Sequence, residues 1–258
     1  MSHKDYKLIS PPSPIKLNRH RLFQPSFTLA EVLITLGIIA IVATMTLPTI
    51  IQKQQTKAIL TSLNKSYSEL QNIVNLISNN YGEDVGVVVK QLDNNQLNQL
   101  FMSYYDNAQD CTDNTCFNGR NITYYNYVDI PLKSFAEGDK TINAYLSNQR
   151  FITKDGRLFI FGERAQHDIN NGLIISVDVN GPFKKPNAWG RDTFSFKITQ
   201  KQIKPCGGLV LCSNVYNFNC NSSQKGIYSG IGCTYYALTK KGFLDKKYYY
   251  DRYIQGEL

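Results

Sequence analysis

FTLAEVLITLGIIAIVATMTLPTII, residues 27–51, is the stretch that decides how this 258-residue chain is organised. It contains one charged residue, Glu31, and the 20 positions from Val32 to Ile51 contain none. A helix of about 20 apolar residues is long enough to cross the hydrocarbon layer of a bilayer. We therefore predict a transmembrane helix over residues 27–51.

The residues before this helix are basic and rich in proline. Residues 1–26 carry five basic side chains against one acid, Asp5, and they contain four prolines without helical periodicity. Basic residues that flank a span stay on the cytoplasmic side. A secretory signal would place a shorter apolar run before its cleavage site, and no such run occurs here. We predict that residues 1–26 form an extended cytoplasmic leader and that the chain after the helix is extracytoplasmic.

The helical pattern continues after the apolar stretch. Six apolar residues follow at spacings of three or four, which is the spacing of one face of an α-helix. They are Ile59, Leu63, Tyr67, Leu70, Val74 and Ile77. We predict an amphipathic continuation of the helix over residues 52–79, packed against a globular domain.

Residues 80–205 are predicted to form that globular domain. Four runs have the composition of β-strands: Phe151–Lys154, Arg157–Phe161, Leu173–Val179 and Thr193–Thr199. A weaker strand is expected over Val85–Val89. Asp155 and Gly156 between the first two runs predict a two-residue hairpin turn. The expected fold is α+β, with a small antiparallel β-sheet packed on the amphipathic half of the helix.

All six cysteines follow the apolar stretch, and they are Cys111, Cys116, Cys206, Cys212, Cys220 and Cys233. An even number in an exported region predicts disulfides. Zinc is the less favoured alternative, because no C-x-x-C spacing occurs. We expect a local Cys111–Cys116 bridge and leave the other pairings open. Residues 206–258 are predicted to be a cysteine-rich, irregular C-terminal subregion.

Ten residues around the helix start, Pro25-Ser-Phe-Thr-Leu-Ala-Glu-Val-Leu-Ile34, resemble the N-terminal signal of type IV pilins and type II secretion pseudopilins. The resemblance implies that a prepilin peptidase cleaves between Ser26 and Phe27 and methylates the new amine of Phe27. Glu31 and Pro48 would then be the fifth and twenty-second mature residues, two positions that this family uses. Ser26 stands where glycine is usual in the family.

A carboxylate inside an apolar helix is costly, so Glu31 is expected to have a partner. No basic residue lies within a helical turn of it in the same chain. The freed amine of Phe27 on a neighbouring subunit is the natural partner, and the alternative is that Glu31 reaches the cytoplasmic interface. Pro48 cannot bond the Thr44 carbonyl, so it either lets the helix bend during assembly or marks the outer end of the span.

The expected function is a non-enzymatic structural subunit of a type IV pilus or a type II secretion pseudopilus. The resemblance implies four partners: the prepilin peptidase, other pilin or pseudopilin subunits, the inner-membrane assembly machinery and the lipid bilayer. It also implies a single-pass location in the bacterial inner membrane, followed by incorporation into the filament. No phosphate-binding glycine loop or nucleophile elbow occurs in the sequence.

Two alternatives stay open. The first is a minor pilin that acts as a tip adhesin or binds DNA or a secreted substrate. The second is an uncleaved, membrane-anchored extracytoplasmic domain. Residues 27–258 hold 23 basic and 19 acidic residues without a dense basic stripe, so nucleic-acid binding has little support in the sequence.

One loop has the composition of a cation site. Asp178, Asn180 and Gly181, followed by Asp192, lie between two predicted strands. Carboxylate and amide oxygens two residues apart, ahead of a glycine, can bind calcium. The alternative is a β-turn held by hydrogen bonds of its Asp and Asn side chains. No other cofactor is expected.

Overall fold

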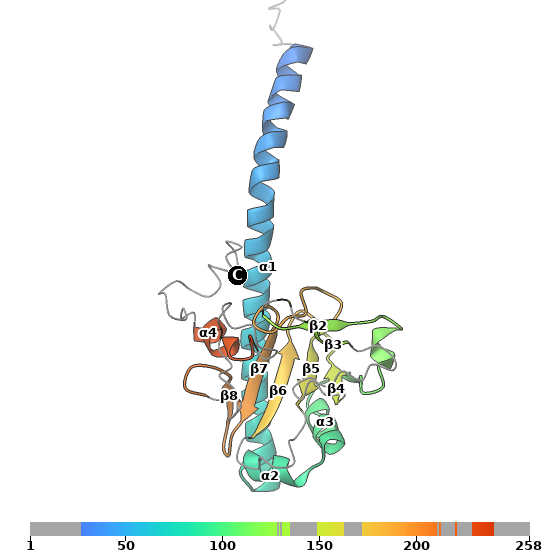
Figure 1. Cartoon of the computed structure of the whole chain (residues 1–258), viewed down its shortest axis with the longest axis vertical. Coiled ribbons are helices and arrows are strands. Elements are labelled where there is room, and N and C mark those ends of the chain that lie inside the picture. The colour runs from blue at the N-terminus through green and yellow to red at the C-terminus, as the bar shows by residue number, and fades with distance from the viewer. Residues whose placement is uncertain are drawn as a thin grey trace, which may run out of the picture. The chain divides into compact units, whose positions relative to one another are not determined.

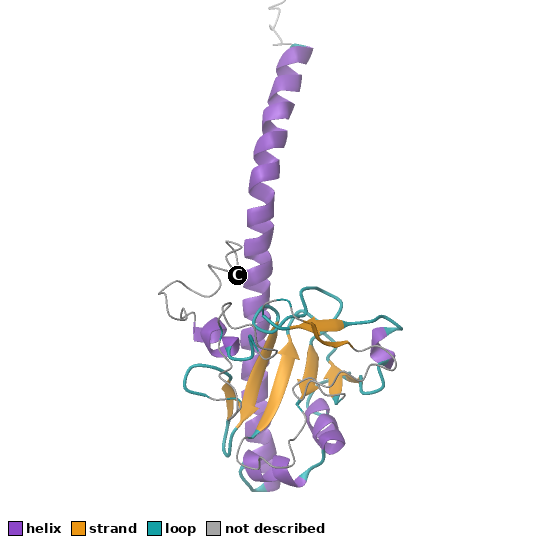
Figure 2. Ribbon diagram, viewed as in Figure 1, coloured by secondary structure: helices purple, strands orange, loops and turns teal. Residues whose placement is uncertain are grey.

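The computed structural model describes residues 27–127, 129, 131–134, 149–162, 172–210, 212, 220 and 229–239. The predicted leader, including Ser26, lies outside these residues. The chain divides into two compact units, Met1–Leu47 and Pro48–Leu258. One helix, α1 (Leu29–Tyr81), contains the residues on both sides of that division. Figure 1 labels the elements and Figure 2 shows their type.

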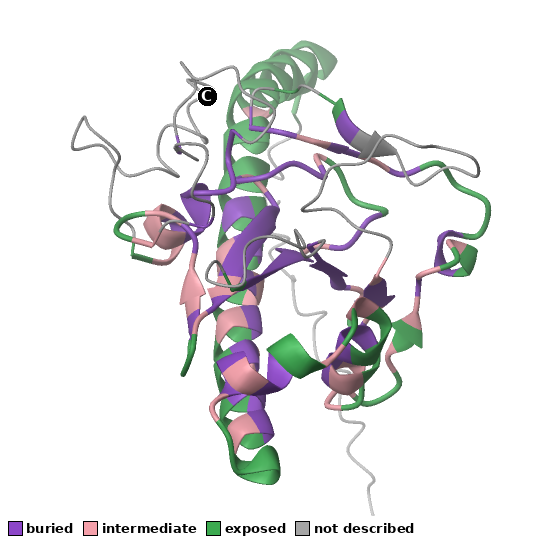
Figure 3. Cartoon of the chain, turned by 60° about the horizontal axis from the view of Figure 1, so that its bottom comes forward, coloured by how far each residue is buried: buried purple, intermediate pink, exposed green. Residues whose placement is uncertain are grey.

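The predicted long N-terminal helix is confirmed and has 53 residues. Its apolar first half is exposed, whereas its second half buries one face against the sheet (Figure 3). The buried residues are Thr56, Ile59, Leu63, Ser66, Leu70, Ile73, Val74 and Ile77. The helix ends two residues beyond the predicted Asn79, where Gly82 adopts a φ of 69° that favours glycine after a helix.

The predicted antiparallel sheet is also confirmed, with six strands in the order β1-β4-β5-β6-β7-β8. Their bounds are β1 Gln109–Asp110, β4 Arg150–Ile152, β5 Leu158–Phe161, β6 Leu173–Asp178, β7 Thr193–Ile198 and β8 Ile203–Pro205. A separate pair consists of β2 (Thr123–Tyr125) and β3 (Pro131–Ser134). The remaining helices are α2 Val85–Gln91, α3 Asn94–Met102, the 3₁₀ turn η1 Thr115–Phe117 and α4 Cys233–Thr239.

The sheet carries a core on each face. On the α1 face, the predicted inward residues Phe194, Phe196 and Ile198 of β7 join the helix, and Tyr67 stacks on Phe196 with ring centroids 5.6 Å apart. A second core includes Ile160 of β5 and Trp189, together with the cysteines of two disulfide-closed loops. Burial on both faces explains why every residue of β5 and β6 is buried and why apolar residues do not alternate with exposed polar ones.

The four predicted central strands correspond to β4, β5, β6 and β7. The turn between β4 and β5 is one residue longer than predicted. Thr153 N–H donates to the Arg157 carbonyl at 2.9 Å and Gly156 N–H donates to the Thr153 carbonyl at 2.8 Å. Gly156 has a φ of 87°, which is the arrangement of a three-residue loop with a glycine bulge.

The predicted strand at Val85–Val89 is wrong, because these residues begin helix α2. Val85, Val88 and Val89 have helical spacing and are buried in the α1-side core, so packing overrides the β-propensity of valine. Gly86 permits the close approach, since its N–H donates to the Gln200 carbonyl at 2.8 Å and an added Cβ would lie 2.6 Å from the Gln200 Cα.

The six cysteines form three disulfides: Cys111–Cys116, Cys206–Cys212 and Cys220–Cys233. The first confirms the expected local bridge. Cys206 N–H donates to the Ser195 carbonyl at 3.0 Å, and Ser195 N–H donates to Thr234 Oγ1 at 2.8 Å. The described residues of the cysteine-rich region therefore pack on the sheet within the same compact unit.

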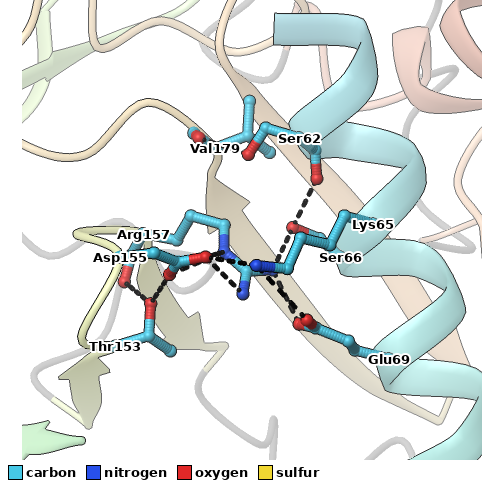
Figure 4. Close-up of polar contacts among 8 residues, drawn as sticks. All are labelled: Ser62, Lys65, Ser66, Glu69, Thr153, Asp155, Arg157 and Val179. Carbon is cyan, nitrogen blue, oxygen red and sulfur yellow. Dashed lines mark hydrogen bonds and ion pairs between the residues drawn. The ribbon is translucent and has the colours of Figure 1, made fainter. Parts of the chain in front are cut away.

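A polar cluster fastens the β4–β5 hairpin to α1 (Figure 4). Arg157, whose side chain is only 4% exposed, donates to Glu69 at 2.7 Å and to Ser66 at 2.9 Å on the helix. It also pairs with Asp155 at 3.0 Å, and Lys65 reaches the same carboxylate at 2.8 Å. Burial alone would raise the pKa of Asp155, but hydrogen bonds from Arg157, Lys65 and Thr153 outweigh it and hold the pKa well below its ordinary value.

We predict that Arg157→Ala lowers the free energy of unfolding by about 3 kcal/mol, because it removes the buried member of an ion-pair network. Lys65→Ala is the matched control. Lys65 is 55% exposed, so its loss should cost less than about 1 kcal/mol. Denaturant unfolding of the full chain in detergent measures both variants. Equal losses would show that Arg157 does not dominate this contact.

Candidate functional site

The first turn of α1 is closed by a capping box. Thr28 N–H and Thr28 Oγ1 both donate to Glu31 Oε2 at 2.8 Å, and Glu31 N–H donates back to Thr28 Oγ1 at 3.2 Å. These reciprocal bonds satisfy backbone donors that a helix start otherwise leaves open. The T-x-x-E pattern of residues 28–31 is the sequence signal of this cap, and it marks the start of the helix.

The cap places a carboxylate at the end of the helix where the peptide dipoles favour negative charge. Glu31 Oε2 holds both bonds from Thr28, and Oε1 bonds none of the residues that the structure describes. Phe27, the residue that would become the chain end, is 80% exposed. The geometry thus leaves one carboxylate oxygen of Glu31 without a bond to a described residue, in the helical turn that follows Phe27.

Beyond the cap, α1 is the one helix among the described residues that is long and apolar enough to cross a membrane. Three hydroxyl groups of its apolar half form hydrogen bonds within the helix. Thr35 donates to the Val32 carbonyl at 3.0 Å, and Thr44 donates to the Ile41 carbonyl at 2.8 Å. Hydroxyl groups bonded in this way can enter hydrocarbon without an unmet donor.

Pro48 lies inside α1, and helix is assigned on both sides of it. The division between the two compact units falls between Leu47 and Pro48. Both earlier interpretations of this proline, a bend during assembly and the outer end of the span, stay predictions.

The predicted cation loop joins β6 to β7 and contains two buried carboxylates. Asp178 accepts hydrogen bonds from Gly181 N–H at 2.9 Å and from the Tyr124 hydroxyl at 2.6 Å. Asp192 accepts from Asn187 N–H at 2.8 Å and from Ala188 N–H at 2.7 Å. The loop is therefore a turn held by its own aspartates, as one of the two alternatives predicted.

Both carboxylates are fully buried, which disfavours their charged forms. Burial, followed by the nearby charge of Asp192, raises the pKa of Asp178 well above its ordinary value. Burial also raises the pKa of Asp192 to about 6, although the Ala188 and Asn187 backbone and the Asn180 side chain oppose the rise. Charging the two buried carboxylates at neutral pH therefore lowers the free energy of unfolding.

The oxygen atoms of this loop are of the kind that a hard cation takes. No group of three or more His, Cys, Asp and Glu that could hold a metal occurs among the described residues, so a site here would depend on amide oxygens. The buried Oδ1 atoms of Asn180 and Asn187 bond none of the residues that the structure describes. Like the carboxylates of Asp178 and Asp192, they are ligand types that calcium accepts. Calcium stays a prediction.

Comparison with protein-family models, with curated proteins and with solved structures found no match to this chain. The support for a function therefore comes from the chain's own residues.

We predict that calcium stabilises the folded chain at neutral pH. An acid whose pKa is higher in the folded than in the unfolded chain holds more protons when folded. Without calcium, the free energy of unfolding should therefore fall as the pH rises from about 4 through about 6. Calcium at about a hundred times its Kd should restore about 2.7 kcal/mol. Thermal unfolding of the full chain in detergent, with calcium or with a chelator, measures this effect.

Asp178→Asn is the control for this prediction. The amide oxygen can still accept the bond from Gly181, but the charge is gone, so both the pH dependence and the calcium effect should shrink. Identical melting temperatures of the unaltered chain in calcium and in chelator would contradict the cation site and leave only the hydrogen-bonded turn.

Proposed function

We propose that this chain is a prepilin-like structural subunit of a type IV pilus or type II secretion pseudopilus. The observation that carries the proposal is the carboxylate of Glu31 in the first turn of an exposed apolar helix, four residues after Phe27. This arrangement needs a positive partner once the helix is buried, and cleavage before Phe27 would create one.

The proposed assembly step is a charge pairing between subunits. A prepilin peptidase removes the leader, and the amine of Phe27 stays positively charged after methylation. Glu31 Oε1 of one subunit accepts a hydrogen bond from the Phe27 amine of its neighbour. Each pairing removes two isolated buried charges, so it sets the axial register in which the helices pack.

The rest of α1 explains how the globular domain is carried into such a filament. The same helix continues into the second compact unit, where one face packs on the sheet and the Arg157 cluster fastens the hairpin to it. Movement of the apolar helix out of the bilayer would therefore move the domain with it. Three disulfides stabilise the domain in an oxidising, extracytoplasmic compartment.

Substitution of Glu31 tests the pairing. Glutamine also serves at the third position of a capping box, so Glu31→Gln keeps the cap and removes only the charge. We predict normal membrane insertion but at least about a tenfold loss of the subunit from isolated filaments, because a neighbour's amine would stay buried and unpaired. Immunoblots of membranes and of sheared filaments measure the two quantities.

Thr28→Ala is the matched control, because it weakens the cap by about 1 kcal/mol and keeps the carboxylate. It should enter filaments nearly as well as the unaltered chain. If Glu31→Gln enters normally and Thr28→Ala does not, then Glu31 serves the helix start and the pairing is refuted.

A further inference from the structure

We propose that the end of the globular unit nearest the apolar stretch binds anionic phospholipid headgroups through a basic rim. The basic rim consists of Lys53, Lys57, Arg120, Phe183, Lys184 and Lys185. The inference rests on the membrane anchoring by α1 proposed above and goes beyond it, since it assigns a lipid-binding role to the folded unit itself.

The apolar stretch of α1 ends a few residues before the helix begins to pack on the folded unit. Ile51, the last residue of the apolar stretch, is exposed, and the first buried residue of the helix is Thr56. Five residues of helix span about 7.5 Å, which is close to one Debye length at physiological salt. The bilayer surface would therefore lie within electrostatic reach of this end of the unit.

The β6–β7 loop lies at that same end. Ser62 on α1 donates to the Val179 carbonyl at 2.6 Å, directly after β6. Figure 1 shows the connection from β6 to β7 at the end of the sheet that faces the start of α1's docked segment. Gly86, at the opposite end of the sheet, bonds the backbone after β7. Strand β6 thus runs toward the start of the docked segment of α1, and the loop extends from the end of the strand.

Hydrogen bonds hold the backbone of the β6–β7 loop in place. Lys184 N–H donates to the Gly181 carbonyl at 3.0 Å, and Asn187 Nδ2 donates to the Pro182 carbonyl at 2.9 Å. These bonds hold the loop backbone and leave the side chains of Phe183, Lys184 and Lys185 exposed. A fixed loop that presents an aromatic ring beside two ammonium groups suits the headgroup region, where aromatic and basic side chains gather.

A neighbouring segment adds a third cation to the same place. The guanidinium of Arg120 lies 5.2 Å from the ring centroid of Phe183. The segment is held there because Tyr125 N–H donates to the Asn187 carbonyl at 2.9 Å and Trp189 N–H donates to the Tyr125 carbonyl at 3.0 Å. Residues far apart in the sequence therefore form one basic and aromatic surface.

Within the part of the chain that the structure describes, the charge of this surface is not neutralised. Residues 52–62, 117–125 and 179–187 contain five basic residues and no acidic residue. None of the five forms an ion pair with a residue that the structure describes. Two carboxylates of the β6–β7 segment, Asp178 and Asp192, are buried, and Asp129 is paired with Arg191 at 2.8 Å.

The opposite end of α1 has a different charge. Residues 81–94 contain Glu83, Asp84 and Asp93 against one base, Lys90. Among the described residues of the folded unit, positive charge therefore gathers at the start of the docked segment of α1 and negative charge at the end of that helix. A basic surface held this close to a bilayer attracts anionic lipid, and its position favours a lipid headgroup over a free nucleic acid.

Lysine acetylation of the full chain in nanodiscs tests this inference. The two samples contain phosphatidylcholine alone or phosphatidylcholine mixed with phosphatidylglycerol, at low salt, and mass spectrometry follows each lysine. Lys184 and Lys185 should react about fivefold more slowly in the anionic nanodiscs. High salt should abolish the difference. Lys90 and Lys201 serve as controls within the same molecule and should react equally in both samples.

Equal acetylation of Lys184 and Lys185 in the two lipids would overturn the inference. Protection by a single-stranded oligonucleotide in phosphatidylcholine, without protection by phosphatidylglycerol, would overturn it in favour of nucleic-acid binding. A different observation, whether the leader is removed, tests the filament proposal. A chain that retains its leader could still show lipid protection, and a processed chain could lack it.

Discussion

The rest of this structure depends on one constraint: a single helix has an exposed apolar half and a half that packs on a sheet. The first half of α1 exposes apolar side chains on all sides, and the second half buries a single apolar stripe against a sheet. The sheet, the three disulfides and the Arg157 cluster all act on the second half. These contacts stabilise the half of α1 that packs on the sheet. No described residue covers the apolar half. Such a helix is long and apolar enough to cross a membrane.

The charged residues differ between the two parts of the chain. The span contains one carboxylate, at the helix end where peptide dipoles favour it. Residues 52–62, 117–125 and 179–187 of the folded unit contain five basic residues and no acidic residue. The β6–β7 segment buries two carboxylates, Asp178 and Asp192, so a cation bound there would add positive charge to the same unit.

The sequence predicted what periodicity and composition control. The helix, the four central strands and the Cys111–Cys116 bridge follow from apolar spacing, a glycine turn and short cysteine separation. The predictions from sequence were wrong or missing where tertiary contacts determine the local structure. The valines at 85–89 form a helix because a core receives them at helical spacing, and the short outer strands β1, β2, β3 and β8 are too brief to carry a pattern. The basic rim could not be predicted, because Arg120 and Phe183 meet only in the fold.

The capping box shows a different limit. Thr28 and Glu31 form a helix-start signal, whereas the sequence predicted for Glu31 either a partner on a neighbouring subunit or a place at the cytoplasmic interface. The structure adds a local role, in which Oε2 accepts both bonds from Thr28, and the proposed pairing would use Oε1. The pairing role requires a chain end at Phe27, which exists only after cleavage.

The most direct test of the central claim is therefore the mass of the N-terminal peptide of the chain isolated from its native membrane. The account predicts a peptide that begins at Phe27 and carries one added methyl group on its amine. A peptide that begins within residues 1–26 would contradict it, because no positive chain end would then exist beside Glu31.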